Sequence, residues 1–165
     1  DNCMSCHSQL IRPFKSETDR YGDYSLSGEY AYDRPFLWGS KRTGPDLHRI
    51  GNYRTTDWHE NHMMAPADIV PGSIMPAYKH MFTKNAEIEI ETAYAEAVTV
   101  KNAFHTPYGP EFKRTRAAWE AHRPKVLEDA AAIAADMKNK DVKEAVANGQ
   151  VPEIVALIAY LNSLK

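Results

Sequence analysis

The chain has 165 residues, which bounds it to one ordinary domain or to one small domain with a large insertion. Hydrophobic residues make up 43% and charged residues 25% of the chain, so a packed core is feasible and global disorder is disfavoured. The net charge of −2 argues against a dedicated nucleic-acid-binding protein, and no apolar run approaches the roughly 18 residues of a membrane helix.

The first motif lies at the N-terminus, where two cysteines and a histidine form the run Cys3-Met4-Ser5-Cys6-His7. This C-x-x-C-H pattern is typical of c-type haem attachment. Two thiols add to the vinyl groups of haem, and the next residue offers an imidazole to the iron. A thioredoxin-like motif would require a β-α-β context, and a zinc site would require further ligands at matching spacing. The pattern therefore predicts one haem c attached through Cys3 and Cys6, with His7 as an iron ligand.

Residues 8–55 show no sustained hydrophobic period, so mostly irregular structure is expected there. A loop-rich segment of this length is uncommon unless it wraps something, and a haem edge is the natural candidate. Gly44-Pro45 marks a turn, and the Pro45 carbonyl is expected to accept a hydrogen bond from His7 Nδ1. Further residues of this segment are expected at the haem: Leu47 and Ile50 against the porphyrin, and Arg34, Lys41, Arg42 and the Trp38 indole N–H at the propionates. A solvated basic loop is the alternative for the cationic members.

A short helix is predicted over residues 57–64, after a threonine cap and before Pro66. Residues 67–78 follow as a loop in which prolines flank Met75 on both sides. Because prolines stiffen a loop, Met75 is the preferred second axial ligand, and methionine–histidine ligation raises the potential of a haem. Met81 is the second choice.

More helices are predicted further along the chain, over residues 86–102, 111–122, 125–138 and 141–148 and in a last segment that begins at Pro152. Pro124 is expected to separate the second of these from the third, and Gly149 to stop the fourth. The last helix has the clearest apolar stripe, formed by Ile154, Leu157, Ile158 and Leu161. No segment shows convincing strand alternation, so the expected fold class is all-α.

The chain resembles the mono-haem cytochrome c subunit (subunit II) of cbb₃-type cytochrome c oxidases, within the haem–copper oxidases. The matching runs are residues 3–13, 17–22, 32–47, 73–78 and 156–161. The run over 32–47, YDRPFLWGSKRTGPDL, is far more specific than C-x-x-C-H, which every c-type cytochrome shares. The resemblance says little about residues 83–150.

This resemblance implies a cytochrome c fold with a long loop-rich segment after the haem motif and a helical insertion before the C-terminal helix. It implies a single cytochrome c domain over residues 1–165, with a haem core of 1–82 and 151–165 and an insertion of 83–150. It also implies that His7 and Met75 are the axial ligands of the one haem c.

The resemblance further implies a role in electron relay from the di-haem cytochrome c subunit towards the catalytic haem–copper subunit, where oxygen is reduced. No catalytic residue is expected in this chain. Family members carry an N-terminal membrane helix that runs into the haem motif and places the domain at the periplasmic face of the bacterial cytoplasmic membrane. The chain starts without that helix or an initiator methionine, so a trimmed or excised sequence is expected. The alternatives are a free soluble cytochrome c shuttle and, less favoured, a haem peroxidase or sensor domain.

Overall fold

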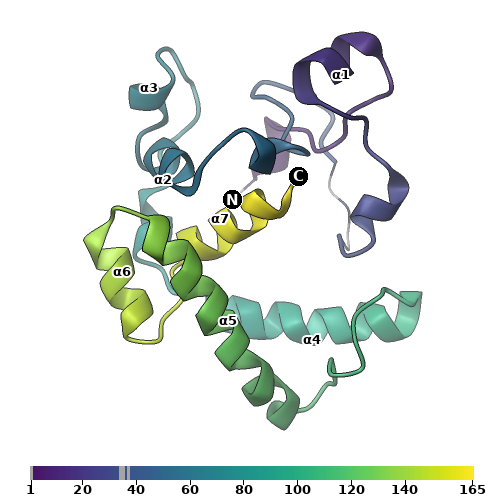
Figure 1. Cartoon of the computed structure of the whole chain (residues 1–165), viewed down its shortest axis with the longest axis vertical. Helices are drawn as coiled ribbons and strands as arrows, with labels where there is room; N and C mark the ends of the chain where they lie inside the picture. Colours follow the sequence, from purple (N-terminus) through teal and green to yellow (C-terminus); the bar gives the residue numbers. More distant parts are fainter. Residues whose placement is uncertain (1, 34–35, 37) are drawn as a thin grey trace. The chain divides into compact units, whose positions relative to one another are not determined.

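The computed structural model of the chain describes residues 2–33, 36 and 38–165 (Figure 1). Over these residues the secondary structure is helical, with one isolated bridge between Asn85 and Pro152 and no strand. This confirms the predicted all-α class. In the part of the chain so described, no helix combines the length and the apolar character needed to cross a membrane.

The chain divides into two compact units. Unit 1 comprises Asp1–Arg54 and Leu161–Lys165, and unit 2 comprises Thr55–Tyr160. This division falls after residue 54, whereas the resemblance implies a haem core of residues 1–82 and 151–165. The single cytochrome c domain with an insertion over 83–150 therefore stays a prediction.

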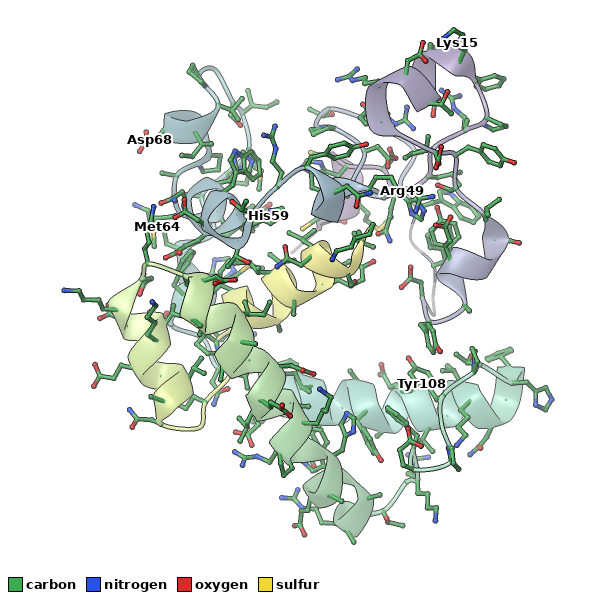
Figure 2. All side chains as sticks on the ribbon, viewed as in Figure 1. Lys15, Arg49, His59, Met64, Asp68 and Tyr108 are labelled. Atoms are coloured by element: carbon green, nitrogen blue, oxygen red, sulfur yellow. The ribbon has the colours of Figure 1, made fainter. Side chains whose placement is uncertain are left out.

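Unit 1 is mostly irregular, as predicted, but it contains one helix that the sequence pattern missed. The α1 helix, Lys15–Tyr21, buries only Glu17 and Tyr21, so it has no apolar stripe that periodicity could detect. Gly22 ends it with a φ of +100°. Lys15, labelled in Figure 2, lies on the exposed side of α1 and pairs with Asp19 one turn later at 2.7 Å. Short 3₁₀ turns complete this unit, at Cys3–Ser5, Ser27–Tyr30 and Ile50–Asn52.

Unit 2 begins with α2, Thr56–Met64, close to the predicted position. Thr55 caps it, since its Oγ1 accepts a hydrogen bond from Trp58 N at 3.2 Å. Pro66 follows α2 as predicted, but it also opens the short helix α3, Pro66–Ile69, at a position where a missing N–H costs nothing. A 3₁₀ turn, Lys79–Phe82, follows the methionine loop.

The remaining helices are α4, Glu87–Phe104, α5, Arg116–Asp136, α6, Lys140–Ala147, and α7, Glu153–Ser163. The predicted break at Pro124 is wrong, because α5 continues through it as one helix. Trp119 is buried on one side of the proline, and Ala130 and Ala134 are buried on the other. Burial on both sides offsets the roughly 3 kcal/mol that a proline costs inside a helix.

Two apolar clusters hold unit 2 together. The larger one joins residues of α2, α5, α6 and α7, and its buried members are Met63, Met81, Phe82, Ala130, Ala134, Met137, Val142, Val146, Val151, Ile154, Val155 and Ile158. The smaller one joins α4 to α5 through Tyr94, Val98 and Trp119. Ile154 and Ile158 of the predicted stripe are fully buried, which confirms that this face of α7 lies in the core.

Candidate haem site

The C-x-x-C-H motif forms a tight turn. The backbone N–H groups of Cys6 and His7 donate to the carbonyl of Cys3, at 3.1 and 2.9 Å. A 3₁₀ turn has three residues, so side chains three positions apart lie one above the other. Cys3 is half-buried, Cys6 is exposed, and both are free thiols. The turn thus holds two at least partly accessible thiols three positions apart, a spacing that suits attachment to one planar group.

The His7 side chain is half-buried and is oriented by the second half of unit 1. Its Nδ1 lies 2.8 Å from the carbonyl oxygen of Pro45, which confirms the predicted hydrogen bond. A carbonyl oxygen only accepts, so Nδ1 carries the proton and Nε2 keeps a free electron pair for a metal. Such a bond also raises the basicity of the imidazole as a ligand.

Two glycines allow the backbone to approach the motif closely. A Cβ at Gly44 would overlap the His7 ring at Cε1 and lie 2.8 Å from both ring nitrogens. Gly39 has a φ of +66°, and a Cβ there would overlap the His7 carbonyl oxygen. The sequence indicated a turn at Gly44 but not this packing. The His7 ring therefore packs directly against the backbone at Gly44, where a larger residue would not fit. This arrangement fits an imidazole held as an iron ligand.

Met75 lies in unit 2, in the loop after α3. Its backbone N–H donates to Ser73 Oγ at 3.2 Å, and Tyr78 N donates to the Met63 carbonyl at 2.9 Å, which ties the loop to α2. The Met75 side chain is half-buried at the edge of the larger apolar cluster. Met81 is instead a buried member of that cluster, 8% exposed. Accessibility therefore favours Met75 over Met81 as a ligand.

The family model described as cytochrome c oxidase, mono-haem subunit/FixO, matches residues 1–165, the whole chain. The chain belongs to this FixO family. As a FixO-family protein it is a cytochrome c of electron transport, a mono-haem subunit of a cbb₃-type cytochrome c oxidase complex. A search among curated proteins found no match to it.

The structure gives the burial and contacts of several other residues that the sequence analysis predicts at the haem of this FixO chain. Leu47 is half-buried, and its N–H donates to the Ser8 carbonyl at 2.9 Å. Ile50 is buried at the start of a 3₁₀ turn. Trp38 is 54% exposed, with its ring edge-on to Phe36 at 5.1 Å. Arg34 lies outside the described residues. The roles of these residues at a haem stay predictions.

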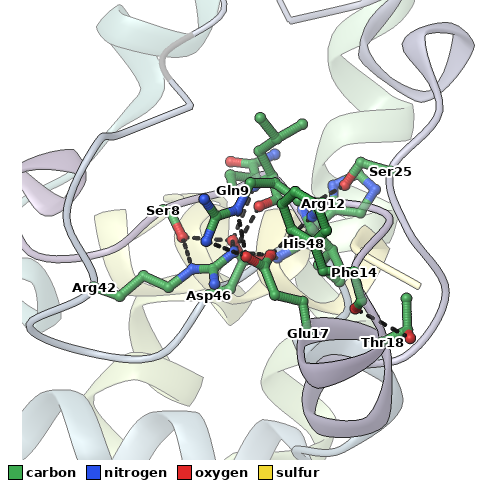
Figure 3. Close-up of polar contacts among 12 residues, drawn as sticks. Ser8, Gln9, Arg12, Phe14, Glu17, Thr18, Ser25, Arg42, Asp46 and His48 are labelled. Atoms are coloured by element: carbon green, nitrogen blue, oxygen red, sulfur yellow. Dashed lines mark hydrogen bonds and ion pairs between the residues drawn. The ribbon is translucent and has the colours of Figure 1, made fainter.

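Arg42 takes part in a polar network that the sequence did not reveal (Figure 3). Its Nε donates to Ser8 Oγ at 2.7 Å, and its Nη2 donates to the Leu10 carbonyl at 2.8 Å and to Glu17 Oε2 at 2.7 Å. Glu17 also pairs with Arg12. The Arg42 hydrogen bond lowers the pKa of the buried Glu17 carboxyl to about 2. These bonds give Arg42 a structural role, and its contact with a propionate stays a prediction.

A second polar network joins Glu29 to the end of the FixO chain. Arg49 Nη1 donates to Glu29 Oε1 at 2.5 Å and to the Lys165 carbonyl at 2.7 Å. The Arg49 hydrogen bond lowers the pKa of Glu29 to about 2. Gly51 N donates to the Leu164 carbonyl at 2.7 Å. The last residues of the chain are therefore fixed within unit 1.

Proposed function

We propose that the chain binds one haem c covalently through Cys3 and Cys6, with His7 and Met75 as its axial ligands. We propose that it relays electrons from the di-haem cytochrome c subunit to the catalytic haem–copper subunit without itself reducing oxygen. The observation that carries the proposal is the 2.8 Å hydrogen bond between His7 Nδ1 and the Pro45 carbonyl, next to two accessible thiols.

The residues of the chain have defined parts in this proposal. The Pro45 carbonyl holds the proton on His7 Nδ1, so the lone pair of His7 Nε2 is free to bind iron. Ser73 anchors the backbone of Met75 and so limits the positions that its thioether can reach. Leu47 and Ile50 supply apolar surface, which lowers the local dielectric, and Trp38 offers its indole N–H to a propionate. The bound haem supplies the one-electron chemistry.

Membership of an oxidase-subunit family supports a stable complex with the catalytic and di-haem subunits. We propose that the domain works at the periplasmic face of the bacterial cytoplasmic membrane, where haem c is attached, and that an N-terminal helix outside this sequence anchors it. Two filled axial positions would leave no open site for oxygen or peroxide, which disfavours the peroxidase alternative.

Optical spectra of the haem-loaded protein, oxidised and reduced, test this assignment. The wild type should be low-spin with a thioether-to-iron charge-transfer band in the red, and Met75→Leu should lose that band. Met81→Leu is the matched control and should keep it, because the swap conserves the volume of a core side chain. A high-spin wild type, or a Met75→Leu protein that keeps the band, would contradict the proposed ligand pair.

Covalent attachment is tested by the mass of the denatured protein. The wild type should retain the haem after denaturation and extraction. Cys3→Ser and Cys6→Ser should each keep at most one of the two thioether bonds, and the double variant should release the haem. Retention of haem by the denatured double variant would contradict attachment through these thiols.

A further inference from the structure

Asp46, the residue after Pro45, has a fully buried side chain with several hydrogen-bonded donors. Its Oδ2 accepts from Ser8 Oγ at 2.5 Å and from Leu10 N at 2.9 Å, while its Oδ1 accepts from His48 N at 2.8 Å. Its side-chain exposure is 0%. Figure 3 draws these contacts together with Arg42, whose Nη2 lies 3.5 Å from Oδ2. One buried carboxyl thus connects the segment after His7 to the segment after Pro45.

The two segments, residues 6–10 and 44–48, are paired along their length, and we call this pair the proximal clamp. Its other bonds are Gly44 N to the Cys6 carbonyl at 2.8 Å, His7 Nδ1 to the Pro45 carbonyl at 2.8 Å, and Leu47 N to the Ser8 carbonyl at 2.9 Å. The His7–Pro45 bond lies inside this ladder. The hydrogen bonds of Asp46 with Ser8 and Leu10 continue the pairing of the two segments beyond His7, away from Gly44.

The carboxyl group of Asp46 suits this position better than an amide would. Both of its oxygens accept hydrogen bonds from backbone N–H groups, one on each side. An asparagine has a single oxygen, so its NH₂ group would face one of these donors and leave a buried N–H without an acceptor. Ser8 reinforces the geometry, because its hydroxyl donates to Asp46 while it accepts from Arg42.

We infer that Asp46 is a positioning residue for the proximal ligand, because it fixes the Pro45 carbonyl against His7 Nδ1. The inference rests on the proposed function only in taking His7 as the iron ligand. The hydrogen bonds of the Asp46 side chain go to Ser8, Leu10, His48 and Arg42 and not to the His7 ring, so Asp46 acts on His7 through the clamp. A looser clamp weakens the hydrogen bond to Nδ1, makes the imidazole less basic, and so favours the reduced over the oxidised iron.

The test compares Asp46→Asn with the wild-type haem-loaded protein in two measurements. The exchange of the His7 Nδ1 proton with solvent, followed by NMR in the reduced state, should become about tenfold faster, the factor expected for the loss of one hydrogen bond. The reduction potential should rise. Ser8→Ala removes the hydroxyl that donates to Asp46 and accepts from Arg42, but it keeps the Asp46 carboxyl and its two backbone hydrogen bonds. It should therefore change both quantities in the same direction by a smaller factor.

Glu60→Gln is the matched control from unit 2. Glu60 is also a buried carboxyl that accepts two backbone N–H bonds, from Lys138 and Asn139 at 2.7 and 2.6 Å. Glu60→Gln should destabilise the protein about as much as Asp46→Asn does, but it should leave the exchange of the His7 Nδ1 proton at the wild-type rate.

Wild-type exchange and potential in both Asp46→Asn and Ser8→Ala would overturn the inference while leaving the proposed function intact. Faster exchange in Glu60→Gln as well would also overturn it, because the effect would then follow general destabilisation. A wild-type protein in which His7 does not bind iron would instead contradict the proposed function, and the optical spectra report that separately. If Asp46→Asn does not fold, Ser8→Ala alone carries the comparison, and an unchanged Nδ1 exchange rate there counts against the inference.

Discussion

The two units of the chain are stabilised by different kinds of interaction. Unit 1 buries charged and polar side chains, among them Glu17, Asp46 and Arg49, each with hydrogen-bonded partners. Unit 2 buries mainly aliphatic, methionine and aromatic side chains on the inner faces of its helices. The backbone explains the difference: a helix satisfies its own N–H and C=O groups, whereas an irregular segment needs side chains to do so.

The two kinds of interaction suit different purposes: apolar contact places whole helices, and hydrogen bonds orient single groups. Helices placed by apolar contact tolerate changes of shape as long as volume is kept, because the hydrophobic effect has no direction. Hydrogen bonds are directional, and a segment held by several of them has one well-defined position. The segment that orients the His7 imidazole is of the second kind, and this suits the proposed role of His7 as an iron ligand.

The largest expected effect comes from opening a cavity in unit 2. Ile158 is fully buried in the larger cluster, and Ile158→Ala should cost about 2–5 kcal/mol of the free energy of unfolding. Amide hydrogen exchange in α5 and α6 measures the loss. Ile88 is 78% exposed, so Ile88→Ala is the control and should change stability by less than about 0.5 kcal/mol. Equal losses in the two variants would show that unit 2 does not depend on apolar burial.

In unit 1 the corresponding weak point is a buried carboxylate. Glu17→Gln should destabilise this unit by about 2 kcal/mol, because it removes the charge that pairs with Arg12 and Arg42 and leaves Arg42 with Asp46 as its ion-pair partner. Asp19→Asn breaks an exposed ion pair with Lys15 on the same helix and should cost less than about 0.5 kcal/mol. Amide exchange of residues 8–12 reports the difference. A harmless Glu17→Gln would mean that the network does not stabilise the loop.

Acid should affect unit 1 more than unit 2. The pKa of Glu17 is about 2 in the folded chain against 4.5 for the free side chain, so the unfolded chain binds the proton first as the pH falls. The stabilisation is complete above pH 4.5 and is lost as the pH falls towards 2. Glu17 alone should account for a loss of about 2 kcal/mol at pH 3, and Glu29 adds a smaller amount because it is more exposed.

In unit 2 the pKa of Glu87 is also lowered, by Arg123, but this pair lies at the surface. Hydrogen exchange measured from pH 6 to pH 3 should therefore show amides of unit 1 losing protection before those of the larger cluster. Earlier loss of protection in α5 and α6 would contradict the comparison.

The sequence predicted the helices of unit 2 better than any part of unit 1. The predicted segments 57–64, 86–102 and 141–148 correspond to α2, α4 and α6, because caps and apolar spacing are local signals. Pro124 was misjudged because the burial of Trp119, Ala130 and Ala134 that compensates for it is a tertiary effect. The α1 helix was missed because its buried face carries a glutamate.

At the candidate site the sequence predicted the His7–Pro45 hydrogen bond but not what surrounds it. Motif spacing indicates which residue types meet, and that was enough for a bond within a well-marked pattern. The partners of Arg42 could not be inferred in this way. From the sequence alone, a cationic residue near a predicted anionic cofactor is assigned to that cofactor. The structure instead shows that Arg42 pairs with Glu17, which lies 25 residues earlier in the chain.

Gly39 and Gly44 have a consequence for how the length of this segment can vary. The backbone is fixed to the haem motif beside each of them, by Gln9 N to the Trp38 carbonyl at 2.7 Å and by Gly44 N to the Cys6 carbonyl at 2.8 Å. A deletion between the two glycines would shorten the stretch that joins these two fixed points, so one glycine would leave its place and a residue with a Cβ would lie against the motif. Substitutions at residues 40, 41 and 43 meet no such restriction. Evolution can therefore change the side chains of this stretch more freely than it can shorten the stretch.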